Sequence, residues 1–220
     1  MAQLMLVRHA QASFGADDYD RLSELGWQQS RWLGEYFAER SMVFDRVVRG
    51  TLRRHTETLA GIAEGMGRTL EFAEDSRLNE YQADALLRAH TGKTEFQKEG
   101  DRREHFRVLR AALYAWTDGS LDLAPEHRFE TFRAGVRDSL AEIRSGQAQR
   151  VLVVSSGGPI STILTEVLGM PARGVVDLNL QTRNTGISEL QAGAKRIHFV
   201  SFNNVPHLDR PDRAGALTYS

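Results

Sequence analysis

The chain has 220 residues, of which 41% are hydrophobic and 26% are charged, a composition typical of a globular protein that folds as one large domain. The 28 Lys and Arg residues nearly balance the 29 Asp and Glu residues, leaving a formal net charge of -1, so we expect no general attraction to nucleic acid or to a membrane surface. No apolar run approaches the roughly 18 residues of a membrane span. The chain has no cysteine, which excludes disulfides, thiolate metal sites and cysteine nucleophiles. The N-terminus lacks the pattern of a signal peptide, and we expect a cytoplasmic protein.

The first third of the chain alternates short apolar runs with helical patterns. Residues 4–7 form a continuous apolar run that predicts a strand buried on both faces of a sheet. Ser23 can cap a helix whose apolar residues continue to Phe37. We further expect a strand at 47–48, a helix at 52–66 that Gly65 and Gly67 end, and a short strand at 70–72.

The middle of the chain interrupts this alternation. Residues 83–125 hold a polar segment through Gly100 and then a helix whose apolar residues recur from Phe106 to Trp116. We interpret 83–125 as a helical insert in a single domain spanning 1–220. A helix is expected after it at 126–145, with Gly146 in the left-handed conformation at its C-terminus.

The last third contains the clearest unit of the sequence. Residues 151–154 predict a buried strand, 155–158 a tight turn, and Pro159 the first residue of a helix that Gly169 ends. A hairpin with strands at 186–190 and 196–202 follows. This alternation predicts an α/β fold with a mostly parallel sheet covered by helices, in which ligands bind beyond the carboxyl ends of the strands.

Two strand ends therefore carry the candidate site residues. Arg8 and His9 follow the first strand, where a guanidinium suits phosphate and an imidazole can act as base, ligand or nucleophile. Ser156 and Gly157 lie in the later turn, where free N–H groups at a helix N-terminus favour an anion. Each feature alone also fits an ordinary turn or a solvated basic pair. The sequence shows neither a dinucleotide fingerprint nor a P-loop, and no metal-ligand spacing.

Several segments together resemble the histidine phosphatase superfamily, in its phosphoglycerate mutase-like branch. The opening motif at 6–12 reads Leu-Val-Arg-His-Ala-Gln-Ala, 22–29 resembles the first capped helix of the family, and 51–58 resembles the segment that supplies a second arginine. Leu-Asn-Glu at 78–80 resembles the site of an acidic proton donor, and 184–188 and 203–208 resemble the closing strands. The resemblance covers about residues 4–208 and implies a three-layer α/β/α sandwich.

The resemblance also implies roles for particular residues. His9 would be the phosphorylated nucleophile, Arg8 and Arg54 would neutralise the phosphate, and Glu80 would be the proton donor. Gln11, Ser156 and Gly157 would complete the phosphate site, together with Arg8 and Arg54. The reaction would need no metal and no cofactor.

Two positions depart from the family pattern. Ala10 replaces a glycine in the opening motif, and Ser156 stands where the family places a second histidine. Because a serine supplies only a neutral donor, and the loss of one transition-state donor costs on the order of 10²–10³ in rate, we expect slow turnover. Restoring the imidazole with Ser156→His would raise turnover roughly ten-fold. His55 is not located well enough by the sequence to count as a replacement.

Three functional classes remain open. The first and favoured one is a phosphomonoester hydrolase that acts through a phosphohistidine. The second is a phosphoglycerate mutase-type phosphotransferase, and the third is a phosphoester-binding protein with little catalysis. The expected partner is a small-molecule phosphomonoester or phosphate, and neither the substrate nor the oligomeric state follows from the sequence.

Overall fold

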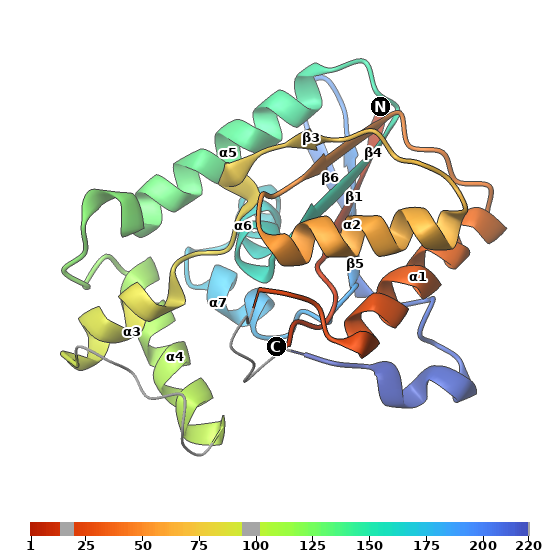
Figure 1. Cartoon of the computed structure of the whole chain (residues 1–220). Coiled ribbons are helices and arrows are strands. Elements are labelled where there is room, and N and C mark those ends of the chain that lie inside the picture. Colours follow the sequence, from red (N-terminus) through yellow and green to blue (C-terminus); the bar gives the residue numbers. More distant parts are fainter. Residues whose placement is uncertain (14–19, 94–101, 220) are drawn as a thin grey trace.

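The centre of the molecule is a six-stranded sheet with the strand order β3-β2-β4-β1-β5-β6 (Figure 1). This computed structural model describes residues 1–13, 20–93 and 102–219. The strands are β1 (Ala2–Arg8), β2 (Arg46–Arg49), β3 (Ala73–Glu74), β4 (Arg150–Ser155), β5 (Ile187–Ala192) and β6 (Ile197–Asn204). β1, β2, β3 and β4 are parallel, whereas β5 and β6 run antiparallel to their neighbours. The expected mostly parallel sheet is confirmed.

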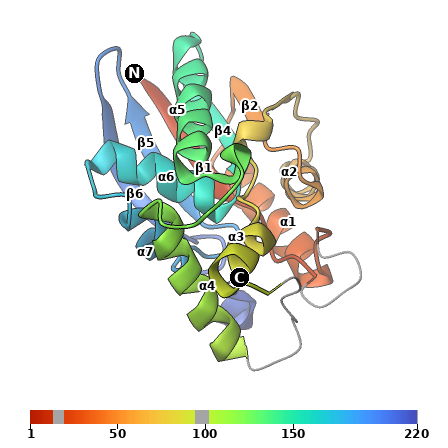
Figure 2. The same ribbon diagram turned by 90° about the vertical axis from the view of Figure 1, so that its left-hand side faces the viewer.

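Helices cover both faces of this sheet (Figure 2). One face packs against α1 (Glu24–Glu39) and α2 (Arg53–Met66), where apolar residues such as Phe37 and Ile62 meet Val7 and Val154. The other face packs against α5 (Phe129–Ser145) and α6 (Gly157–Leu168). β1 and β4 are apolar on both faces because both faces are covered, which explains their continuous apolar runs. The three-layer α/β/α arrangement agrees with the expectation.

A third apolar cluster lies at one end of the molecule, around α3 (Ala83–Thr91), α4 (Arg102–Thr117) and α7 (Gly174–Asn179) (Figure 1). The expected polar segment at the start of 83–125 is instead helical over α3, whose Leu86 and Leu87 are buried against Trp116. Residues 94–101 of the expected insert lie outside the described residues. α7 was not expected either, because it is too short for a periodic pattern.

Several expected boundaries were wrong. The third strand is β3 at 73–74 and not 70–72, because pairing with β2 and not local hydrophobicity sets its position. Gly65 lies inside α2, and only Gly67 ends the helix. A Cβ at Gly65 would come within 2.1 Å of the Arg31 carbonyl oxygen in α1, so the glycine allows α1 and α2 to pack closely. Gly146 is extended, with φ of -76°, and α6 begins at Gly157, before Pro159.

The sheet register brings the two important strand ends to one edge. β1 pairs with β4 so that Arg8 lies beside Ser155. β2, which pairs with the other side of β4, ends at Arg49, four residues before α2 begins at Arg53.

No helix among the described residues is long and apolar enough to cross a membrane.

Candidate active site

Arg8 and His9 lie at the carboxyl edge of the sheet and are both only 4% exposed. The backbone N–H of His9 donates to the carbonyl of Ser155, and the Arg8 guanidinium donates to the carbonyl of Thr182. Asn184 donates from its side chain to the His9 carbonyl over 3.1 Å. The backbone of this dipeptide is therefore held between β4 and the loop that precedes β5.

The His9 ring is buried and neutral. Nδ1 lies 2.8 Å from the Ala10 carbonyl oxygen, and because a carbonyl can only accept, the proton lies on Nδ1 and the lone pair on Nε2. Burial lowers the pKa of His9 well below its usual range, and the nearby cations of Arg54 and Arg8 lower it further. His9 is therefore uncharged at neutral pH, with Nε2 available for attack.

Arg54 reaches the same place from the first turn of α2 and is 8% exposed. Its guanidinium forms an ion pair with Asp20. The Thr58 hydroxyl donates to the Arg54 carbonyl and accepts the backbone N–H of Ala10 over 3.0 Å, which ties α2 to the segment after β1. Arg54 and Arg8 both lower the pKa of His9 through their charges, so the structure brings these three residues together.

Glu80 completes the cluster from the loop after the short 3₁₀ helix at Ser76–Leu78. Its Oε1 accepts the backbone N–H of Gly158, in the first turn of α6, over 3.0 Å. Burial raises the pKa of the Glu80 carboxyl, and the cations of Arg54 and Arg8 act in the opposite direction. A carboxyl with a raised pKa that lies beside two arginines is suited to moving a proton to or from a phosphate ester.

Two glycines let the surrounding side chains approach the start of α6 closely. A Cβ on Gly158 would lie 2.2 Å from Glu80 Oε1, and a Cβ on Gly157 would lie 2.1 Å from Asn179 Oδ1. Ser156 is the N-cap residue of α6 and is fully buried, but its hydroxyl makes no capping hydrogen bond. That hydroxyl instead lies 2.7 Å from Nε2 of His55. The Ser156 side chain therefore does not act as a helix cap.

The remaining expected site residue is less closely joined to this cluster. Gln11 accepts the Ser23 hydroxyl at its side-chain oxygen over 2.7 Å, and its backbone N–H donates to Gln29. Sequence reasoning missed Asp20 and Thr182, which hold the two arginines, and set His55 aside. Only the adjacency of His55 to Arg54 could have pointed to it.

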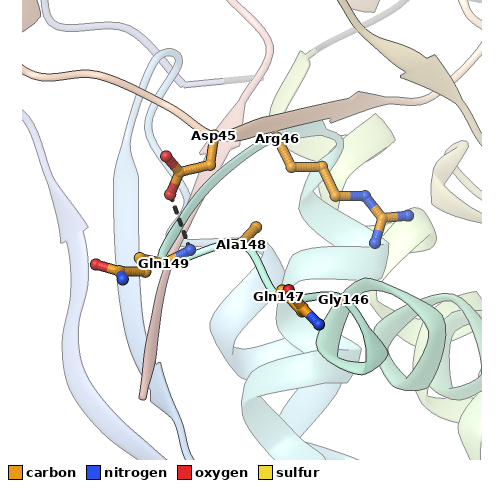
Figure 3. Close-up of a pocket in the computed structure, with 6 residues that line it drawn as sticks. All are labelled: Asp45, Arg46, Gly146, Gln147, Ala148 and Gln149. Atoms are coloured by element: carbon orange, nitrogen blue, oxygen red, sulfur yellow. Dashed lines mark hydrogen bonds between the residues drawn. The ribbon is translucent and has the colours of Figure 1, made fainter.

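A surface hollow lined by Asp45, Arg46 and residues 146–149 lies at the amino ends of β2 and β4, at the opposite edge of the sheet (Figure 3). The Asp45 carboxylate there accepts the backbone N–H of Gln149 and so holds the segment that leads into β4. Among the described residues, no group of three or more His, Asp or Glu side chains could hold a metal ion.

Both the sequence and the fold of this chain match known proteins. Residues 4–205 match the histidine phosphatase superfamily (branch 1), and the chain belongs to that superfamily. A Hydrogenobacter thermophilus protein provisionally named phosphoserine phosphatase 2 is 26% identical over 223 residues, covering 94% of this chain and 98% of its own. A Salmonella arizonae protein provisionally named phosphoglycerate mutase GpmB is 27% identical over 224 residues, covering 96% of this chain and 97% of its own.

Solved structures share the fold. A phosphoserine phosphatase variant from Entamoeba histolytica, in complex with phosphoserine, superposes with a TM-score of 0.65 at 20% identity, covering 94% of this chain and 100% of its own. A mycobacterial glucosyl-3-phosphoglycerate phosphatase in complex with inorganic phosphate gives a TM-score of 0.65 at 21% identity, covering 93% and 98% of the two chains. These structures show the fold, and the membership of the superfamily rests on the match over residues 4–205.

Proposed function

We propose that this chain hydrolyses small phosphomonoesters through a phosphohistidine formed on His9. The observation that carries the proposal is a buried, neutral His9 with Nε2 free, placed beside Arg8, Arg54 and a carboxyl of raised pKa. The phosphoserine and inorganic phosphate bound by the two structural relatives support a small phosphate ligand.

The reaction has two steps in this arrangement. In the first, Nε2 of His9 forms a bond to phosphorus while the ester P–O bond breaks, and protonated Glu80 gives its proton to the leaving alkoxide. In the second, Glu80 takes a proton from water, the hydroxide oxygen bonds to phosphorus, and the P–N bond breaks to return neutral His9. Arg8 and Arg54 offset the charge of the phosphoryl oxygens in both steps. The steps use side chains of this chain alone, so we propose a reaction independent of metal and cofactor.

The relationship to a protein provisionally named as a mutase keeps a second outcome open. A mutase would return the phosphoryl group from His9 to a substrate hydroxyl instead of to water. The two reactions differ only in the acceptor of the second step, so the released products separate them.

The test is turnover of a panel of phosphorylated sugars, amino acids and glycerates, with free phosphate as the measured product. Wild-type protein is expected to release phosphate, and His9→Ala is expected to release none. His127→Ala is a control, because His127 lies in the 3₁₀ helix at Pro125–His127, outside the cluster. Release of phosphate by His9→Ala at the wild-type rate would contradict the proposal. Transfer of the phosphoryl group to a second metabolite without release of phosphate would favour the mutase.

A further inference from the structure

The contact between His55 and Ser156 joins two side chains that are 101 residues apart in the chain. His55 lies in the first turn of α2 and Ser156 at the start of α6, and both are 0% exposed. The ring centroids of His55 and His9 are 5.8 Å apart. An imidazole and a hydroxyl therefore meet directly beside the proposed nucleophile.

The surroundings of His55 leave space for an imidazole at this point. Gly50 faces the ring, and a Cβ there would lie 2.2 Å from Nδ1 and 2.6 Å from Cε1 of His55. Among the described residues, Nδ1 has no partner in good hydrogen-bond geometry, although the Gly50 backbone lies close enough to act on the ring, and the contact with Ser156 is the one well-formed hydrogen bond of the imidazole. A buried imidazole that served only to fill space would carry a desolvation cost that an apolar side chain avoids. The hydrogen bond with Ser156 is therefore the interaction that offsets the desolvation cost of the ring.

The charges around the ring keep it neutral. Burial lowers the pKa of His55 well below its usual range, and the cations of Arg54 and Arg49 lower it further, whereas the Gly50 backbone acts in the opposite direction. A neutral imidazole carries its single proton on one nitrogen. With the proton on Nε2, the ring donates to Ser156 Oγ.

We propose that His55 is a positioning residue that holds the Ser156 hydroxyl so that its O–H points at a phosphoryl oxygen. Nε2–H of His55 donates to Oγ of Ser156, and the Ser156 hydrogen is thereby free to donate to the phosphoryl group. No proton leaves either group and no covalent bond changes. The imidazole that the family resemblance placed at position 156 thus acts from position 55 through a serine. This inference rests on the proposed hydrolysis through His9.

The structure also revises the expected effect of Ser156→His. The serine oxygen already lies 2.7 Å from Nε2 of His55, and both residues are fully buried. A second imidazole at 156 would overlap the first, and overpacking of a buried site is destabilising. Ser156→His is therefore expected to gain activity only when His55 is removed at the same time.

The first experiment measures kcat and KM for phosphoester hydrolysis by His55→Ala, His55→Gln and His55→Asn. We expect His55→Ala to lower kcat about 10–100-fold with little change in KM, because a direct donor is worth on the order of 10²–10³ and His55 acts one bond further away. The Gln amide reaches the place of Nε2, whereas the Asn amide stops near Nδ1. His55→Gln is therefore expected to keep more activity than His55→Asn.

The second experiment is a double-mutant cycle with a relocated imidazole. The pair His55→Ala/Ser156→Ala should lose no more activity than Ser156→Ala alone, because His55 acts only through Ser156. The pair His55→Ala/Ser156→His should recover activity above His55→Ala and above Ser156→His. Ser161→Ala is the matched control, since Ser161 lies in the same helix, is equally buried, and has no partner for its hydroxyl among the described residues.

Vanadate binding and melting temperature check that each variant is folded. Folded His55→Ala or Ser156→Ala with kcat within two-fold of wild type would overturn the proposal. Equal losses for Gln and Asn at position 55, together with no recovery by the relocated imidazole, would assign His55 to packing and would also overturn it. If wild-type protein hydrolyses no phosphoester, the proposed function fails first. If wild type is active and only the His55 and Ser156 variants behave as the control, the positioning role alone fails.

Discussion

Gly158→Ala should separate the role of the Glu80 carboxyl from the rest of the site. The Gly158 backbone N–H donates to Glu80 Oε1 over 3.0 Å, and an added Cβ would lie 2.2 Å from that oxygen. It would also lie 2.8 Å and 3.0 Å from two ring carbons of Tyr81. Ordinary contact begins at 3.4 Å, so the carboxyl must retreat by more than about 1 Å, a displacement of the kind that costs roughly 10²-fold in rate.

The loss should depend on the leaving group of the substrate. Alkyl phosphates need a proton on the departing oxygen, so their kcat/KM should fall about 10²-fold. p-Nitrophenyl phosphate needs little protonation and should lose much less. The fold should survive, because the gain of roughly 1 kcal/mol from Ala over Gly in a helix opposes an overpacking cost of about 1–3 kcal/mol.

Steady-state kinetics on both substrates, with melting curves, provides the measurement. Gly135→Ala is the control, because a Cβ at Gly135 in α5 would meet only the Arg77 side chain, at 3.6 Å or more. The control should keep wild-type kinetics. Gly158→Ala with unchanged kinetics, or with equal losses on both substrates, would refute the role of Glu80 as proton donor.

The remaining predictions concern anion binding and pH. Phosphate should raise the melting temperature of the wild type, by the equivalent of about 2.7 kcal/mol at a hundred times its Kd. Arg8→Ala should lose this shift, whereas Arg31→Ala, at a half-buried arginine paired with Glu64, should keep it. A wild-type melting temperature that phosphate does not change would contradict the site. Because the pKa of His9 is lowered, activity should persist at pH values below the pKa of an ordinary histidine. Because the pKa of Glu80 is raised, activity should decline as rising pH deprotonates this carboxyl. Glu80→Gln should abolish the alkaline decline in a pH–rate profile. Burial lowers the pKa of His207 to about 3, so the unfolded chain binds a proton first as pH falls below about 6.5, and each pH unit below that value should cost up to about 1.4 kcal/mol of unfolding free energy. His207→Gln should remove this share of the acid dependence in urea unfolding, whereas the shares of His9 and His55, whose pKa values are also lowered, should remain. An unchanged slope would contradict the prediction.

The parts of the fold that the sequence predicts well are those determined by local burial. β1 and β4 are continuous apolar runs because helices cover both faces, and this pattern is visible without the structure. β3 is only two residues long and both are exposed, so its position depends on pairing with β2 and has no local signal. α3 was hidden because only Leu86 and Leu87 of its residues are fully buried.

The site shows the same division between local and distant information. Motifs within a few residues, such as Arg8 with His9, can be recognised in the sequence, and the structure places Arg54 and Glu80 beside them. The contact of His55 with Ser156 could not be foreseen, because it depends on how α2 and α6 meet at the end of β4. The sequence around position 156 therefore gives no sign that an imidazole lies beside it.

The most direct test of the account is detection of the phosphorylated enzyme. Wild-type protein is mixed with a phosphoester, quenched within one turnover, and kept at alkaline pH, where phosphohistidine survives, before peptide mass spectrometry. The account predicts one added phosphoryl group on His9 and its absence in His9→Ala. With p-nitrophenyl phosphate, whose leaving group needs little protonation, it also predicts accumulation of the phosphoryl group in Glu80→Gln, where water is no longer activated. Hydrolysis by wild type with no phosphoryl group on His9, or with the group on another residue, would contradict the central claim.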